Sequence, residues 1–174
     1  MSMAPTLGTG VSSLPPEGAL AASGRPGGGS AQQGCPFCEG PGGRVVFEGA
    51  KLRVIHAEEA GFPAFYRVIW REHAPEFSDL DAADRVLCME AVTVVEQCLR
   101  EQLRPTKINL AALGNMVPHL HWHVIARFDW DSHFPSPFWA AAQRAAPVGR
   151  VAELQALLPE LEAEMVRRLV LLQG

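Results

Sequence analysis

Three histidines occupy alternate positions in one short run, PHLHWHVI, at residues 118–125. Side chains at positions i, i+2 and i+4 of a β-strand share one face of the sheet, so a strand here groups His119, His121 and His123. The apolar residues between them then face a hydrophobic core. Imidazole titrates nearer neutrality than any other side chain, so three on one face can attack, move protons or bind a metal ion. The run therefore predicts a strand that carries chemistry on one face, as in an enzyme.

Two other interpretations of the run stay open. The histidines could simply be solvated on an exposed strand face. They could also form a pure metal site, as in some β-barrel oxygenases, but such sites generally need a carboxylate and a further distant histidine. No acidic residue falls within residues 118–125, which disfavours the metal-only interpretation.

Size and composition fit one folded domain. The chain has 174 residues, of which 48% are hydrophobic, enough for a sizeable core. A net charge of −4 without a long basic cluster argues against binding to duplex nucleic acid. No apolar run reaches the roughly 18 residues of a membrane span, and a signal-peptide pattern is lacking. We therefore expect a cytoplasmic protein with neither membrane nor nucleic-acid partners.

The order of sequence patterns predicts an α+β fold. Residues 1–34 are rich in Gly, Pro, Ser and Ala, which predicts a disordered extension ahead of a domain at 35–174. Within the domain, strands are predicted at 44–48, 52–57, 65–70 and 107–113 and at the histidine run. A long helix is predicted after Ser78 as N-cap, ending at Pro105, and a C-terminal helix from about Val151. These elements predict an antiparallel five-stranded sheet with one long helix and a C-terminal helix.

The histidine run resembles the signature of the histidine triad (HIT) superfamily of nucleotide hydrolases and transferases. The likeness covers residues 35–128 and includes the order of elements and a Gly-Asn loop before the run. His123 resembles the hydrolase branch, because the hexose-phosphate transferase branch usually has Gln there. The resemblance implies a homodimer and a nucleotide substrate, such as a dinucleoside polyphosphate or a nucleoside phosphoramidate. It implies no cofactor for the chemical step.

The resemblance also implies roles for individual residues. His121 would attack the α-phosphate and form a nucleotidyl-histidine intermediate. His123 would donate a hydrogen bond to a phosphate oxygen, and His119 would protonate the leaving group or bind metal. Asn115 stands where relatives carry a Gln that contacts the phosphates, and Asn109 matches a family Asn near the ribose or phosphate. Both asparagines are also ordinary strand-end and turn residues.

Three positions depart from the family pattern. Met116 stands where hydrolase relatives have Ser or Thr, and Phe65 or Tyr66 stands where they have a histidine entering the third strand. The usual Pro-Lys pair after that strand is Trp70-Arg71. Because of these changes, the resemblance does not identify the substrate. The same changes favour an alternative to the enzyme, a nucleotide-binding regulatory module without turnover.

Cys35 and Cys38 form a CxxC pair, a common half of a tetrahedral zinc site. Some bacterial relatives complete a structural zinc site with a histidine just after the third strand and the first triad histidine. The matching residues here are His73 and His119. Two unligated cysteines are the alternative. A redox pair is disfavoured because no thioredoxin-like βαβ pattern surrounds it.

The segment 129–147 is rich in aromatic residues and proline and matches no regular element. Its aromatic residues are predicted to pack in the core, with a pocket wall or a dimer contact as alternatives. They are Trp130, Phe134, Phe138 and Trp139.

Overall fold

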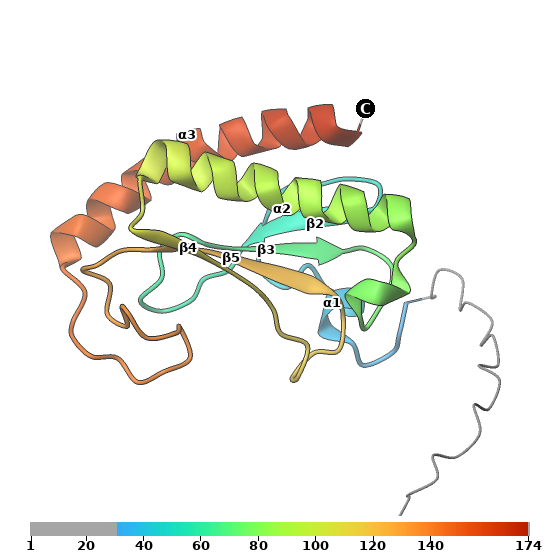
Figure 1. Ribbon diagram of the computed structural model, residues 1–174, viewed down its shortest axis with the longest axis horizontal. Coiled ribbons are helices and arrows are strands. Elements are labelled where there is room, and N and C mark those ends of the chain that lie inside the picture. The colour runs from blue at the N-terminus through green and yellow to red at the C-terminus, as the bar shows by residue number, and fades with distance from the viewer. Residues whose placement is uncertain (1–30, 174) are drawn as a thin grey trace, which may run out of the picture.

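The computed structural model describes residues 31–173, so the predicted disorder of the extension concerns mainly residues outside the described range. The described part is an α+β fold with one antiparallel sheet, as predicted (Figure 1). In chain order the elements are α1 (Pro36–Glu39), β1 (Arg44–Glu48), β2 (Leu52–His56), β3 (Phe65–Trp70), the 3-10 helix η1 (Phe77–Asp79), α2 (Ala82–Leu103), β4 (Lys107–Ala112), β5 (His121–Arg127) and α3 (Val148–Gln173).

The sheet has the strand order β1-β2-β3-β5-β4, and every neighbouring pair is antiparallel. The strand with the histidines, β5, therefore lies inside the sheet. Its register pairs Ile69 with His121 and Arg67 with His123 on β3, and Ala111 with His123 on β4. Directly paired residues share a face of the sheet, so these side chains surround the histidines.

Helices α2 and α3 pack together over one face of the sheet, while α1 and the segment 129–147 lie on the other side (Figure 1). The alternation of β5 matches this division. Leu120 and Val124 belong to the core beneath the helices, and Trp122 packs against it, as predicted. The strand itself begins later than predicted, because His119 precedes its first residue.

The start of α2 corrects the predicted N-cap. Ser78 lies within η1, and the helix begins three residues later, where the Asp81 carboxylate accepts from the Asp84 backbone N–H at 2.8 Å. Ser and Asp are similarly favourable N-cap residues, so the local sequence does not separate Ser78 from Asp81 as the start of the helix. Arg104 ends the helix in the left-handed region at φ 48°, and Pro105 follows, as predicted.

The C-terminal helix α3 starts at Val148, three residues before the predicted start. It is amphipathic, and its apolar stripe completes the core: Leu154, Leu158, Leu161, Met165 and Leu169 are buried. Glu162 joins the helix to the sheet, since it accepts from the Tyr66 hydroxyl at 3.0 Å and from the Arg44 guanidinium. None of the helices in the described part of the chain is apolar enough over a sufficient length to span a membrane.

Candidate active site

His121 and His123 line a pocket of about 490 Å³ on the face of the sheet that α2 and α3 do not cover. Phe37 of α1 forms one wall, and its ring centroid lies 4.9 Å from that of His121. Segments far apart in sequence supply the rest of the lining. These are the loop after β4, with Leu113, Asn115, Met116 and Val117, and the segment 129–147, with Phe138 and Trp139.

The orientation of His121 is fixed by the backbone next to it. Its Nδ1 lies 2.6 Å from the carbonyl oxygen of His119. A carbonyl can only accept, so Nδ1 carries the proton and Nε2 is left with a free lone pair. Burial lowers the pKa of His121 below its ordinary value, although the hydrogen bond to His119 opposes this. His121 is therefore neutral at pH 7 and has a basic nitrogen available for attack on an electrophile.

His123 is more isolated than His121. Only 5% of the residue is exposed, and neither ring nitrogen has a hydrogen-bond partner among the described residues. Its ring centroid lies 4.9 Å from that of His121. Burial, followed by the proximity of His121 and Arg67, lowers the pKa of His123 to about 3. A neutral imidazole has one N–H donor and one acceptor, and buried polar groups normally have partners, so this ring is suited to a bound ligand.

His119 belongs to a second cluster, with the predicted cysteines and His73. Its Nδ1 lies 3.4 Å from Cys35 Sγ and 3.5 Å from Cys38 Sγ, and His73 Nδ1 lies 3.4 Å from Cys38 Sγ. All four donor atoms lie within 4.8 Å of one another. Tetrahedral zinc with these ligands needs an S···N separation of about 3.6 Å, so the donor set fits the ion. The His119 Nε2 donates to the Trp70 carbonyl at 2.7 Å, the outer contact typical of a metal-ligating histidine.

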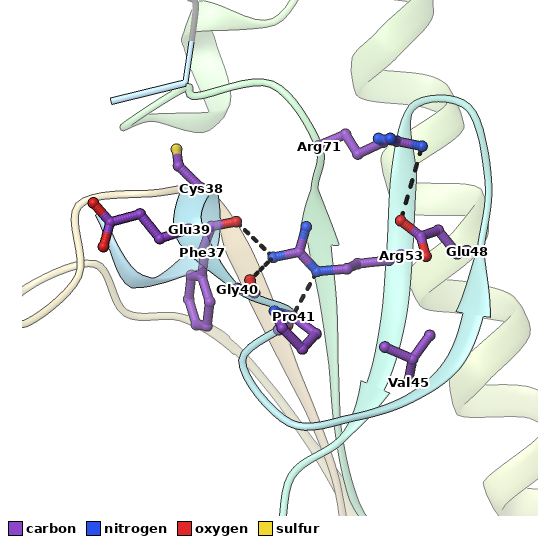
Figure 2. Close-up of a pocket in the computed structure, with 9 residues that line it drawn as sticks. All are labelled: Phe37, Cys38, Glu39, Gly40, Pro41, Val45, Glu48, Arg53 and Arg71. Atoms are coloured by element: carbon purple, nitrogen blue, oxygen red, sulfur yellow. Dashed lines mark hydrogen bonds and ion pairs between the residues drawn. The ribbon is translucent and has the colours of Figure 1, made fainter. Parts of the chain in front are cut away.

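The cysteine turn is held by Arg53, which extends from β2 and is only 7% exposed (Figure 2). Its guanidinium donates to the carbonyl oxygens of Phe37 at 2.7 Å, Gly40 at 3.0 Å and Pro41 at 3.0 Å. A one-turn helix cannot satisfy these carbonyls itself, so the arginine supplies donors that α1 lacks. In Figure 2 the Cys38 thiol points away from this guanidinium. The thiol contacts His73 and His119 instead.

The two predicted substrate-binding asparagines lie in different surroundings. Asn115 lines the pocket. Asn109 is not among the lining residues, and its Oδ1 accepts from Arg127 Nη1 at 2.8 Å. Its register partner is Ile125, one pair along the sheet face from His123. The substrate role of Asn109 stays a prediction, with the side-chain NH₂ left as its available donor.

A buried ion pair organises the segment 129–147. Arg127 is 2% exposed and donates to both carboxylate oxygens of Asp131, at 2.8 and 3.1 Å. Asp131 also accepts backbone N–H groups of Phe128, His133 and Phe134. These bonds fix the backbone at the start of an irregular segment. Further along, this segment contributes Phe138 and Trp139 to the pocket lining.

The aromatic residues of this segment divide between core and pocket. Trp130 packs against the main core, as predicted, and stacks on Phe128 at 4.7 Å. Core packing is wrong for Trp139, which is 65% exposed at the pocket. Phe138 packs on the rings of His123 and Phe65, at 5.5 and 5.3 Å. The alternative of a pocket wall is therefore correct for Trp139, whereas Phe138 lines the pocket and also packs against a buried apolar cluster, as predicted.

Arg67 is a pocket residue that sequence reasoning missed. It lies on β3 directly opposite His123, and its Nε is buried without a partner. The departures from the family pattern are nearby. Phe65 lies on the histidine face, with its ring 5.2 Å from that of His123, and Met116 is 92% exposed at the pocket. Alternation along the predicted third strand places Arg67 on one face with Phe65 and Ile69, but it does not show that Arg67 is paired with His123.

Comparison with known proteins identifies the family. A model of the HIT domain matches residues 42–130, and a search of curated proteins finds no match. The solved structure of a histidine triad protein from Bradyrhizobium japonicum is similar, with 29% identity, a TM-score of 0.60 and coverage of 72% of this chain and 92% of that one.

Two more distant structures agree in fold. A histidine triad protein from Marinobacter aquaeolei is 24% identical with a TM-score of 0.57, over 72% of this chain and 92% of that one. A protein from Streptococcus mutans is 19% identical with a TM-score of 0.54, over 87% and 99%. The HIT family includes nucleotide hydrolases and transferases. The domain match covers about half of the chain and includes the three histidines, and the chain belongs to the histidine triad (HIT) family.

Proposed function

We propose that this protein is a nucleotide hydrolase or nucleotidyl transferase that acts at the α-phosphate through a covalent intermediate on His121. The observation that carries the proposal is the 2.6 Å hydrogen bond from His121 Nδ1 to the His119 carbonyl. It places the proton on Nδ1, so the Nε2 lone pair is the one available to a substrate in the pocket. A neutral imidazole held in this way is a competent nucleophile toward phosphorus.

The proposed reaction has two displacement steps. In the first, the Nε2 lone pair of His121 forms a bond to the α-phosphorus, and the bond from phosphorus to the leaving group breaks. The leaving group takes the electron pair and then a proton from water. In the second step, water attacks phosphorus, the P–N bond breaks, and the electron pair returns to Nε2. The products are a nucleoside monophosphate and neutral His121, with one proton released to solvent.

His123 supports this reaction as a hydrogen-bond donor. Its ring is adjacent to that of His121, and both of its nitrogens are buried without partners among the described residues. A neutral His123 can donate one N–H to a phosphate oxygen. Charge builds up on that oxygen during attack, so a donor already in place stabilises the transition state more than the ground state.

For His119 the geometry favours a metal-binding role over leaving-group protonation. Its Nε2 donates to Trp70, and its Nδ1 faces the two cysteine thiols. We propose that Cys35, Cys38, His73 and His119 hold a structural zinc ion. Such an ion cross-links α1, the loop after β3 and the residues ahead of β5, and it supplies no step of the reaction. Metal analysis of the purified protein beside Cys35→Ser is the direct test, since equal and negligible zinc in both removes this part of the proposal.

Turnover is tested with adenosine 5′-phosphoramidate and diadenosine tetraphosphate, with release of AMP as the measurement. We expect release by the wild type and none by His121→Ala. His133→Ala is the matched control, because it removes a histidine outside the pocket lining. Rapid quenching and mass analysis of the histidine peptide should detect an added nucleotidyl group on His121. Absence of any release that depends on His121 would refute the enzyme proposal.

The second candidate is a nucleotide-binding regulatory module without turnover. Met116 favours it, because this 92% exposed apolar side chain stands at the pocket where hydrolase relatives carry a hydroxyl. In the same experiment this candidate predicts binding of AMP without product release from either substrate. Calorimetric titration with AMP therefore separates it from an inactive preparation.

We also propose that the protein is a homodimer, as the resemblance implies. The support is a sheet edge available for pairing, since β4 is the outer strand and its Leu110 is 41% exposed. Light scattering coupled to gel filtration measures the mass, and a monomer at micromolar concentration would contradict the proposal.

A further inference from the structure

The pocket has a single positive charge in an otherwise mainly apolar lining. Among the lining residues, all of them in the described part of the chain, Arg67 alone has a full charge, and no carboxylate is present. Burial lowers the pKa of His123 to about 3, so this ring adds no charge at pH 7. The remaining lining is apolar except for the Asn115 amide. A single cation therefore sets the electrostatic potential in this cavity.

Arg67 is held at the histidines by the sheet itself. It is the register partner of His123, and its neighbour two residues on, Ile69, is the partner of His121. Paired Cβ atoms in an antiparallel sheet are about 5 Å apart, so the Arg67 stem begins beside the His123 ring. Its guanidinium lies over the Phe65 ring at 5.2 Å, which limits where its donors can point.

The hydrogen-bonding capacity of Arg67 is largely unused. Its Nε is buried and has no partner among the described residues. Among the residues that the structure describes, its one ion pair is with Glu59, at 3.8 Å from Nη2, and the Glu59 side chain is 39% exposed. A long ion pair to a solvent-exposed carboxylate is weak. By contrast, the buried Arg127 has its donors bonded to Asp131, Asn109 and Ser136.

We infer that Arg67 is an anion-binding residue, and that it holds a phosphate oxygen of a 5′-phosphorylated nucleotide whose α-phosphorus lies at His121. The identity of this ligand rests on the proposed function. Guanidinium donors match phosphate oxygens in geometry, and such charge-assisted bonds are roughly twice as strong as neutral ones. Phosphate oxygens can accept from Arg67 Nε and from the one N–H of the neutral His123, and their charge complements the guanidinium. Arg67 thereby determines that the pocket prefers a nucleotide to a nucleoside.

The test compares ligands that differ only in the phosphate. Calorimetry measures the dissociation constants of AMP and adenosine, and of GMP and guanosine, for the wild type, Arg67→Met and Arg67→Lys. We expect the wild type to prefer at least one monophosphate to its nucleoside by about 10- to 100-fold. Arg67→Met should remove most of this preference, because only the His123 N–H is then left to bind the phosphate, and should leave nucleoside affinity within about twofold. Arg67→Lys should retain a larger part of the preference. Arg71→Met is the control, because it removes an equal charge outside this pocket and should leave the preference unchanged.

A measurement on the wild type covers the case in which an Arg67 variant fails to fold. In protein labelled with ¹⁵N-arginine, the Nε–H resonance of Arg67 should shift with AMP or GMP and not with the nucleosides. The inference is overturned if the wild type shows no phosphate preference, if Arg67→Met keeps that preference, or if this resonance does not respond.

The outcomes separate this inference from the proposed function. Product release with an unchanged phosphate preference in Arg67→Met overturns the role of Arg67 and leaves the enzyme in place. Loss of the preference in Arg67→Met without any product release by the wild type supports Arg67 and refutes the enzyme in favour of the regulatory module.

Discussion

The tautomer of His121 is set by the backbone of His119, whose carbonyl oxygen lies 2.6 Å from His121 Nδ1. The His119 ring in turn lies in the cluster with Cys35 and Cys38, at 3.4 and 3.5 Å from their sulfur atoms. His119 therefore belongs to both sites, with its side chain in the Cys/His cluster and its backbone carbonyl at His121. A disturbance of the cluster should reach His121 through His119 and through Phe37, which lies between the two cysteines and packs on the His121 ring.

Substitution of Cys35 by Ser tests that connection. We expect the variant to lose zinc, to unfold at a lower temperature and to show a kcat reduced by about 10- to 100-fold, the usual effect of losing an outer contact at a metal or catalytic site. The measurements are metal content, thermal unfolding and steady-state release of AMP. Cys88→Ala is the control, because Cys88 is buried in the main core, early in α2 and outside the Cys/His cluster, so this variant should keep its metal. A variant without metal and with wild-type kcat would contradict the connection.

Burial of His123 predicts an acid-sensitive fold. Its pKa is about 3 in the folded protein and near the ordinary 6.5 in the unfolded chain. Between these values the unfolded chain binds the proton and the folded protein does not, so the free energy of unfolding falls as pH falls from 6.5 toward 3. Above pH 6.5 this contribution to stability is fully present. Urea unfolding at pH 7.5 and 5.0 should show a smaller loss for His123→Phe than for the wild type.

The control for this prediction is a substitution that reduces packing against His123 and leaves the histidine in place. Phe138→Leu alters the ring that contacts His123 at 5.5 Å, so it should lower stability by a similar amount at both pH values. If His123→Phe and the wild type lose equal stability on acidification, His123 does not carry the effect.

The sequence could predict most of the fold because its patterns are local. Alternation in residues 118–125 correctly separates Leu120 and Val124, in the core, from His121 and His123, at the pocket. Alternation fails on β3, where five of six residues are buried and neither face looks polar. Arg67 was therefore missed, since its place at the pocket depends on its pairing with His123 on the neighbouring strand.

Other parts of the site depend on contacts between distant segments, which no local pattern records. The side-chain oxygen of Asn109 is bonded to Arg127 of the neighbouring strand, 18 residues away. Trp139 reaches the pocket because Arg127 and Asp131 hold the start of an irregular segment. The Cys/His cluster could be named in advance only by resemblance, since His73 and Cys35 are distant in sequence and meet only in the folded chain.

The Arg127–Asp131 pair should contribute strongly to the order of that segment. Both side chains are buried, with 2% and 4% exposed, so Arg127→Met leaves the buried Asp131 carboxylate without its cationic partner. We expect a loss of about 3–5 kcal/mol in the free energy of unfolding, measured with urea. The control Arg100→Met removes an exposed pair with Glu96 and should cost less than about 1 kcal/mol. Equal effects of the two substitutions would show that the buried pair has no special role.

Removal of the Trp139 side chain should weaken ligand binding and leave the stability of the fold nearly unchanged. Its side chain is 65% exposed beside the pocket, so its removal takes little from the core. An indole face at the pocket can stack on a base, and such stacking is worth about 1–3 kcal/mol by alanine substitution. Trp139→Ala should therefore weaken AMP binding by roughly 5- to 150-fold, change the free energy of unfolding by less than about 0.5 kcal/mol, and raise KM more than it lowers kcat. The matched control Trp130→Ala removes a core-packed indole and should show the reverse pattern, with lower stability and AMP affinity close to wild type. If Trp139→Ala binds AMP as tightly as the wild type, the base does not lie against this side of the pocket.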